Sequence, residues 1–149
     1  MSDIGFYHLV RSPLEKALPK LLEKVLESGA RAVVMASSEE RVESLASVLW
    51  TYHPNSFLPH GTARDGKPDQ QPIWLTERDE NPNGATILVL TDGATSDAVD
   101  RYARCLEIFD GGDPDAVGRA RERWRGYKDA GHNVTYYQQT ESGGWEKKA

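Results

Sequence analysis

The sequence lacks several features that would assign it at once to a class of protein. It contains a single cysteine, Cys105, so it cannot form an internal disulfide, and a reducing compartment is favoured. No apolar run approaches the roughly 20 residues that cross a bilayer. The first residues also lack the basic-then-apolar pattern of a signal peptide. We therefore expect a cytoplasmic protein with no membrane contact.

Positive charge is also in short supply. The 149 residues include 18 Lys and Arg against 23 Asp and Glu, which gives a formal net charge of −5. A domain that neutralises DNA phosphates by itself normally carries a basic excess. We therefore expect that any binding of nucleic acid uses a local basic patch or occurs through a partner protein.

Glycine is missing where a nucleotide-binding sheet needs it. The first predicted strand-to-helix turn is Val10-Arg11-Ser12-Pro13, and neither GxGxxG nor GxxxxGK[ST] occurs. A phosphate loop uses glycines to let backbone N–H groups close on the anion. This absence weakens a nucleotide-binding interpretation, and we expect no cofactor.

Side chains that bind metals or act as nucleophiles are scattered. His8, His53, His60 and His132 form no pair at metal-ligand spacing. Cys105 lies in an apolar segment, where a buried, inert thiol is expected. The sequence predicts no metal site.

What the sequence does contain is a regular alternation of short apolar strands with amphipathic helices. Strands are predicted at residues 5–10, 31–36, 72–76, 85–90, 105–109 and 133–139, and helices after Ser12, after Ser37, weakly at 96–101, and from Asp113 to about Ala130. This order predicts one α/β domain over residues 1–149, with a flexible tail from about residue 141. Its mostly parallel sheet has helices on both faces and resembles nucleotide-binding sheets without their phosphate loop.

Two helix starts have the form of capping boxes, from Ser12 to Glu15 and from Ser37 to Glu40. Pro19 falls within the first helical pattern. It either kinks this helix or marks the place where the helix begins.

Two aspartates offer an enzymatic alternative. Asp92 and Asp110 each follow a predicted strand, and carboxylates at the ends of neighbouring parallel strands could hold Mg²⁺ for phosphoryl transfer. The same residues also suit turns, because glycine follows each of them. No general base or phosphate loop accompanies them, so catalysis is the less favoured interpretation.

A proline-bounded loop after the second helix carries large aromatic side chains. Trp50 lies near the end of that helix, and Phe57 and Pro59 follow in the loop. Stiffened aromatics of this kind are typical of protein-binding hot spots. The alternative is that Trp50 and Phe57 are core residues that cover the edge of the sheet.

The last helix gathers positive charge beside an aromatic side chain. At 100° per residue, Arg121, Arg125 and Lys128 share one stripe, and Trp124 borders it. Such a surface suits an acidic peptide with a hydrophobic anchor, because a guanidinium group can bind a carboxylate through two parallel hydrogen bonds. The alternative is an ordinary solvated helix face.

Three groups of residues resemble the chi subunit family of bacterial DNA polymerase III. They are Phe6-Tyr7, then Leu49-Trp50 with Ser56-Phe57-Leu58-Pro59-His60, and then Ala120 to Lys128 with Ala130-Gly131. The resemblance implies a non-catalytic clamp-loader accessory protein in DNA replication, with a nucleotide-binding-like sheet that binds no nucleotide.

The resemblance also implies two partners. It assigns binding of the psi subunit to Trp50, Phe57, Pro59 and His60. It assigns binding of the acidic C-terminal tail of single-stranded DNA-binding protein to Arg121, Trp124, Arg125 and Lys128, so that contact with single-stranded DNA is indirect. Trp124 replaces the usual tyrosine and Arg125 the usual lysine, and both changes keep the physical type.

Overall fold

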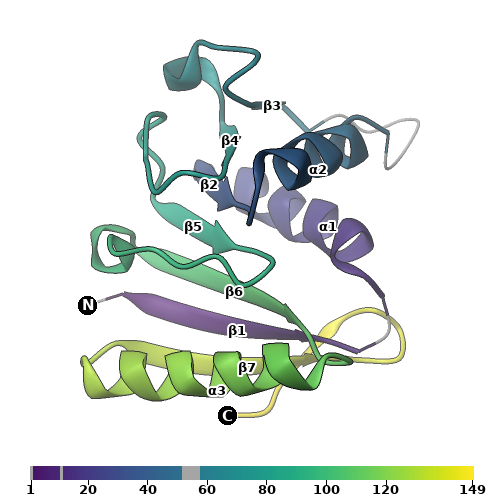
Figure 1. Cartoon of the computed structure of the whole chain (residues 1–149), viewed down its shortest axis with the longest axis vertical. Coiled ribbons are helices and arrows are strands. Elements are labelled where there is room, and N and C mark those ends of the chain that lie inside the picture. The colour runs from purple at the N-terminus through teal and green to yellow at the C-terminus, as the bar shows by residue number, and fades with distance from the viewer. Residues whose placement is uncertain (1, 11, 52–57) are drawn as a thin grey trace.

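A single mostly parallel sheet organises the computed structural model, which describes residues 2–10, 12–51 and 58–149. Within these described residues, eight strands lie in the order β3-β4-β2-β5-β6-β1-β7-β8, and only the β7–β8 pair is antiparallel (Figure 1). The strands are β1 (Asp3–Leu9), β2 (Ala32–Met35), β3 (His60–Gly61), β4 (Ile73–Thr76), β5 (Ile87–Leu90), β6 (Arg104–Asp110), β7 (Asn133–Gln139) and β8 (Trp145–Lys147). The helices are α1 (Leu14–Glu27), α2 (Glu39–Thr51) and α3 (Pro114–Asp129).

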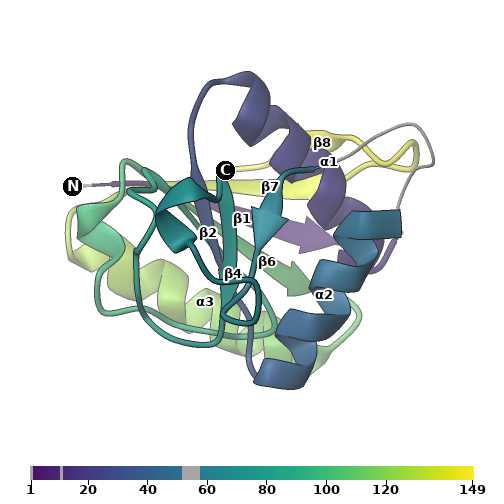
Figure 2. The same ribbon diagram turned by 90° about the horizontal axis from the view of Figure 1, so that it is seen from above.

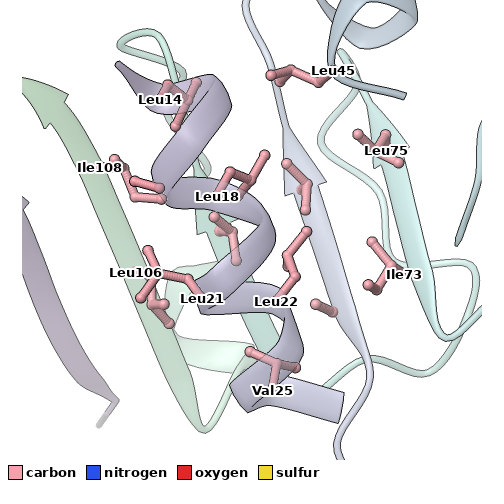
Figure 3. Packing of buried hydrophobic residues seen from close by; sticks show 14 of the residues in the cluster. Leu14, Leu18, Leu21, Leu22, Val25, Leu45, Ile73, Leu75, Leu106 and Ile108 are labelled. Carbon is pink, nitrogen blue, oxygen red and sulfur yellow. The ribbon is translucent and has the colours of Figure 1, made fainter. Parts of the chain in front are cut away.

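Helices α1 and α2 cover one face of the sheet. The leucines of α1 recur every three or four residues, so they form one buried stripe that packs on β6 and the neighbouring strands (Figure 3). Leu18 and Leu22 are fully buried there. Full burial of each such side chain stabilises the fold by about 1.5–3 kcal/mol.

Helix α3 covers the opposite face, and Figure 2 shows it across the sheet from α1. Phe6 of β1, Leu88 of β5 and Cys105 of β6 lie beneath this layer and are fully or almost fully buried. The predicted fold class, a mostly parallel sheet with helices on both faces, is confirmed. Within the described residues, no helix is long and apolar enough to cross a membrane.

The helix starts differ from the predicted capping boxes. Helix α1 begins after Pro13, and no side chain caps it. The Ser12 hydroxyl instead accepts a hydrogen bond from the Gln139 side-chain amide at 2.7 Å, so a distant strand has displaced the local cap. The helix runs without a break through Pro19, so a start at Pro19 is wrong. At α2 it is Ser38 that accepts from the Arg41 N–H, at 3.2 Å.

Two strands lie where the sequence predicts none. Strand β3 has only two residues, too few for a pattern to show. Strand β8 lies in the segment for which the sequence predicts a flexible tail, and its residues pair with β7 from Tyr137 to Gln139. The weak helix predicted at 96–101 is a single 3₁₀ turn, Val99–Arg101.

Candidate protein-binding sites

The start of α3 is defined by its own sequence. The Asp113 carboxylate accepts a hydrogen bond from the Asp115 N–H at 3.0 Å, and Pro114 occupies the first helical position. Asp115 lies in the first turn and Lys128 in the last, so both charges complement the helix dipole. Only Ala120 of the helix is buried. Part of the helix, including Arg123 and Trp124, is half-buried, and the remaining residues are exposed.

Trp124 joins this helix to the sheet. Its ring lies edge-on to the Phe6 ring, 5.5 Å between centroids, and edge-on to the Tyr136 ring at 6.3 Å. Edge-to-face pairs at these distances add about 0.5–1.5 kcal/mol each beyond burial. Trp124 remains half-buried, so it supports the core and also faces outward.

Of the predicted cation stripe, Lys128 contacts this ring and Arg121 lines a pocket with it, while Arg125 and Lys128 do not line that pocket. Arg121, Arg125 and Lys128 are all exposed, and the Lys128 ammonium lies 5.3 Å from the Trp124 ring centroid. Arg121 and Trp124 together border a pocket of about 410 Å³. We call this the α3 pocket; it is lined by Phe6, His8, Phe109, Val117, Ala120, Arg121, Trp124, Tyr136 and Ala149.

Two polar side chains in the α3 pocket are not evident from the sequence. The Tyr136 hydroxyl and the His8 ring nitrogen Nδ1 form a hydrogen bond between neighbouring strands β7 and β1. Burial lowers the pKa of His8 below 6.5, and nearby Asp110 opposes part of that change. The alternation of side chains along each strand predicts which face these residues occupy, but not that β1 and β7 are neighbours.

Arg123 belongs to the core, not to the exposed cation stripe. Its Nε donates to both carboxylate oxygens of Glu107, at 2.6 and 2.9 Å, and the Glu107 side chain is only 3% exposed. Burial raises the pKa of the Glu107 carboxyl, and the Arg123 guanidinium and a hydrogen bond with Tyr127 oppose part of that rise. Glu107 interrupts the apolar run at residues 105–109, and a charged side chain in such a run is the signal in the sequence that a buried partner is required.

The described residues around the aromatic loop, Trp50 and residues 58–60, lie at the other edge of the sheet. The Trp50 side chain, near the end of α2, is 61% exposed, so it is not a core residue. Its ring lies edge-on to the His60 ring of edge strand β3, with centroids 5.4 Å apart. The His60 Nδ1–H donates to the Leu58 carbonyl at 2.6 Å, which fixes that ring. Pro59 is exposed beside it.

Phe57 falls outside the described residues. Trp50 and Pro59 therefore define what we call the β3-edge surface, and His60, which is buried at 9% exposure, packs against the Trp50 ring and supports that surface. Leu58, which the sequence groups with the aromatic loop, is buried in the core on the α1 face.

The two aspartates of the enzymatic alternative lie together but are already engaged. Asp92 and Asp110 both line a pocket of about 600 Å³ at the carboxyl ends of the strands. Both oxygens of Asp92 accept hydrogen bonds from Arg41, at 2.7 and 3.3 Å, and one oxygen of Asp110 accepts from the Gly112 N–H at 2.8 Å. Among the residues that the structure describes, no group of three or more His, Cys, Asp or Glu side chains is arranged to hold a metal ion.

Cys105 is buried on the α3 face of the sheet, as its apolar strand predicts. Burial raises the pKa of its thiol, and the neighbouring Glu107 charge adds to that rise. The thiolate, the nucleophilic form, is therefore strongly disfavoured.

Comparison with known proteins identifies the family. Residues 1–135 match the family model described as "DNA polymerase III chi subunit, HolC". The chain belongs to the chi subunit family. It is 36% identical over 109 residues to the "Probable DNA polymerase III subunit chi" of Rickettsia prowazekii (strain Madrid E), covering 73% of this chain and 66% of that protein.

A second chi protein is more distant. The "DNA polymerase III subunit chi" of Escherichia coli (strain K12) is 25% identical over 126 residues, or 83% of this chain and 84% of that protein. The chain spans slightly less than two thirds of the length of the Rickettsia chi protein.

The residues that match the chi family include some of the candidate-site residues and not others. The β3-edge surface and the cations of α3 all lie within residues 1–135. Tyr136 and Ala149, which line the α3 pocket, lie beyond the matched residues, as does β8.

Proposed function

We propose that this chi-family chain is a non-catalytic accessory subunit that links two proteins of the bacterial replication machinery. One partner is the psi subunit, at the β3-edge surface. The other is the acidic C-terminal tail of single-stranded DNA-binding protein, at the α3 pocket. The observation that carries the proposal is the distance between these two surfaces.

The two surfaces lie at opposite ends and on opposite sides of one sheet. Strand β3 and strand β7 are separated by six strand spacings, or roughly 29 Å at about 4.8 Å each. Helix α2 carries Trp50 on one face, and α3 carries Trp124 on the other. Two partners can therefore occupy the chain together without touching the same residues, as a linking function requires.

The chemistry of the α3 pocket favours an acidic peptide that ends in an apolar residue. Phe6, Trp124 and Tyr136 give the pocket aromatic walls, and Arg121 stands at its border. Each charge-assisted hydrogen bond contributes about 1.5–3 kcal/mol, and burying one phenylalanine side chain contributes a similar amount. After the entropic cost of ordering the tail is subtracted, we expect a micromolar Kd, which corresponds to a binding free energy of about −8 kcal/mol.

The β3-edge surface favours an apolar partner. Trp50 is the most exposed large apolar side chain among the described residues. Its neighbours Pro59 and His60 are held by an edge strand and by a backbone hydrogen bond, so the surface is largely preformed. Rigid aromatic anchors bind at low entropic cost.

Peptide binding tests the proposal directly. Fluorescence anisotropy with a labelled acidic peptide ending in phenylalanine should give a micromolar Kd that weakens as salt is added. The double variant Arg121→Ala, Arg125→Ala should bind at least about 30-fold more weakly. Arg119→Ala, which removes an exposed cation of the same helix that lies off the stripe of Arg121 and Arg125 and lines a different pocket, is the matched control. Equal affinity for all three proteins would reject the proposed tail site.

A further inference from the structure

The C-terminal segment folds back along strand β7 (Figure 1). The chain turns at Thr140 to Gly144, where the Thr140 N–H donates to the Gly144 carbonyl at 2.8 Å. Strand β8 then runs antiparallel to β7, and the pairing extends past its end. The Tyr136 N–H donates to the Ala149 carbonyl at 3.1 Å, and the Lys148 N–H donates to the Tyr136 carbonyl at 2.8 Å.

An aromatic contact anchors this segment from the other face of the sheet. The Trp145 ring lies edge-on to the Tyr7 ring, with centroids 5.0 Å apart, and Tyr7 stacks on Tyr137 at 4.9 Å. Trp145 packs against the core on the α1 side. Residues 143–149 are thus held by backbone pairing and by a tryptophan.

The last residue of the segment, Ala149, lines the α3 pocket at its outer side. Phe109, Phe6 and Tyr136 line it from the successive strands β6, β1 and β7. Ala149 lines it as well and lies beyond β7, on the side away from β1. Without residues 143–149, β7 would be an edge strand and the pocket would be open on this side.

We propose that residues 143–149 close the outer end of the α3 pocket, so that the pocket accepts the terminal apolar residue of an acidic peptide and excludes a peptide that continues past that residue. The inference rests on the proposed function of the same pocket. It concerns a segment outside residues 1–135, the part that matches the chi family. Discrimination of this kind comes from a wall that clashes with the wrong ligand.

Two peptides and two forms of the chain test the inference. One labelled peptide is acidic and ends in phenylalanine, and the other continues with three further residues after the same phenylalanine. The full chain should prefer the first peptide at least about 10-fold, and a chain truncated after Ser142 should prefer it less than about 2-fold. Circular dichroism checks that the truncated chain is folded.

A point variant keeps the test independent of truncation. Ala149→Glu adds one negative charge at the wall and should weaken binding of the phenylalanine-ending peptide about 5-fold. Ser142→Glu adds the same charge at the turn, outside the lining of the α3 pocket, and should leave affinity unchanged.

The outcomes separate the two proposals. If the full chain binds neither peptide, the proposed tail site is wrong and this inference falls with it. If the full chain binds both peptides equally well, only the inference is overturned. The same holds if truncation leaves the preference unchanged and Ala149→Glu leaves the affinity unchanged. Tighter binding by the truncated chain would show that the segment competes with the peptide, which also overturns it.

Discussion

The Lys128 ammonium lies 5.3 Å from the centroid of the Trp124 ring, and that ring lines the α3 pocket. This cation–π contact holds a positive charge next to the aromatic wall and contributes about 0.5–1 kcal/mol at an exposed site. Lys128→Gln should weaken binding of the acidic peptide about 3- to 10-fold, because the positive charge held beside the Trp124 ring is lost. Anisotropy measures the change.

The matched control for Lys128 is Lys24→Gln, which removes an exposed lysine from α1 on the other side of the sheet. The Lys24→Gln variant should bind the peptide with the same affinity as the unmodified chain. An equal loss in both variants would mean that the total charge of the protein matters, and not the position of Lys128 beside Trp124.

Arg123 should contribute to the stability of the fold, whereas Arg121 and Arg125 of the same helix should contribute to peptide binding. Arg123→Ala leaves the Glu107 carboxylate buried without its guanidinium partner. We expect the free energy of unfolding to fall by about 3–5 kcal/mol. Urea denaturation measures this, with the exposed Arg125→Ala as a control that should change stability by less than about 0.5 kcal/mol. Replacing both members of the pair with methionine should restore much of the loss, and an unchanged Arg123→Ala midpoint would contradict the assignment.

Neighbouring residues of α2 should behave in opposite ways. Leu49 is fully buried and Trp50 is 61% exposed. Leu49→Ala should lower the free energy of unfolding by about 2–5 kcal/mol. Trp50→Ala should leave the unfolding midpoint nearly unchanged and weaken binding of the psi subunit by about 2–4 kcal/mol. Calorimetry with purified psi measures the second effect, and a Trp50→Ala protein that binds psi normally would reject the β3-edge surface.

The folded chain should lose stability on mild acidification because of His8. Burial lowers the pKa of His8 below 6.5, so the unfolded chain binds a proton in a pH window where the folded chain does not. The free energy of unfolding therefore falls as pH drops from about 6.5 toward the folded-state pKa. Asp110 and the Tyr136 hydroxyl face His8, and the Asp110 charge opposes part of this effect.

Urea denaturation at about pH 7.5 and about pH 5.5 isolates the contribution of His8 when the chain is compared with His8→Gln. The loss of stability between the two pH values should be smaller in the variant. A loss of the same size in both proteins would assign the pH dependence to other groups.

The sequence predicts the parts of the molecule that depend on local patterns. The apolar strand that contains Cys105 and the start of the last helix at Asp113 can both be identified from the sequence, and the structure confirms them. Local patterns do not determine which strands become neighbours. The α3 pocket brings His8 next to Tyr136 across 128 positions of sequence.

Competition between local and distant partners explains the remaining differences. Ser12 has the sequence context of a helix cap, but the Gln139 amide satisfies its hydroxyl instead. Strand β8 has too few residues to show a periodic pattern, and its position depends on the pairing with β7 and the contact between Trp145 and Tyr7. The outer wall of the α3 pocket could therefore be found only in three dimensions.

Simultaneous binding is the most direct test of a linking subunit. Sedimentation velocity should be recorded on the chain mixed with the psi subunit and with the labelled acidic peptide, following the peptide's absorbance. The account predicts that the peptide sediments with a chain–psi complex, and that its Kd changes by less than about 2-fold when psi is saturating. The Trp50→Ala variant should lose psi and keep the peptide. The Arg121→Ala, Arg125→Ala variant should lose the peptide and keep psi. Displacement of the peptide by psi would contradict the two-ended arrangement.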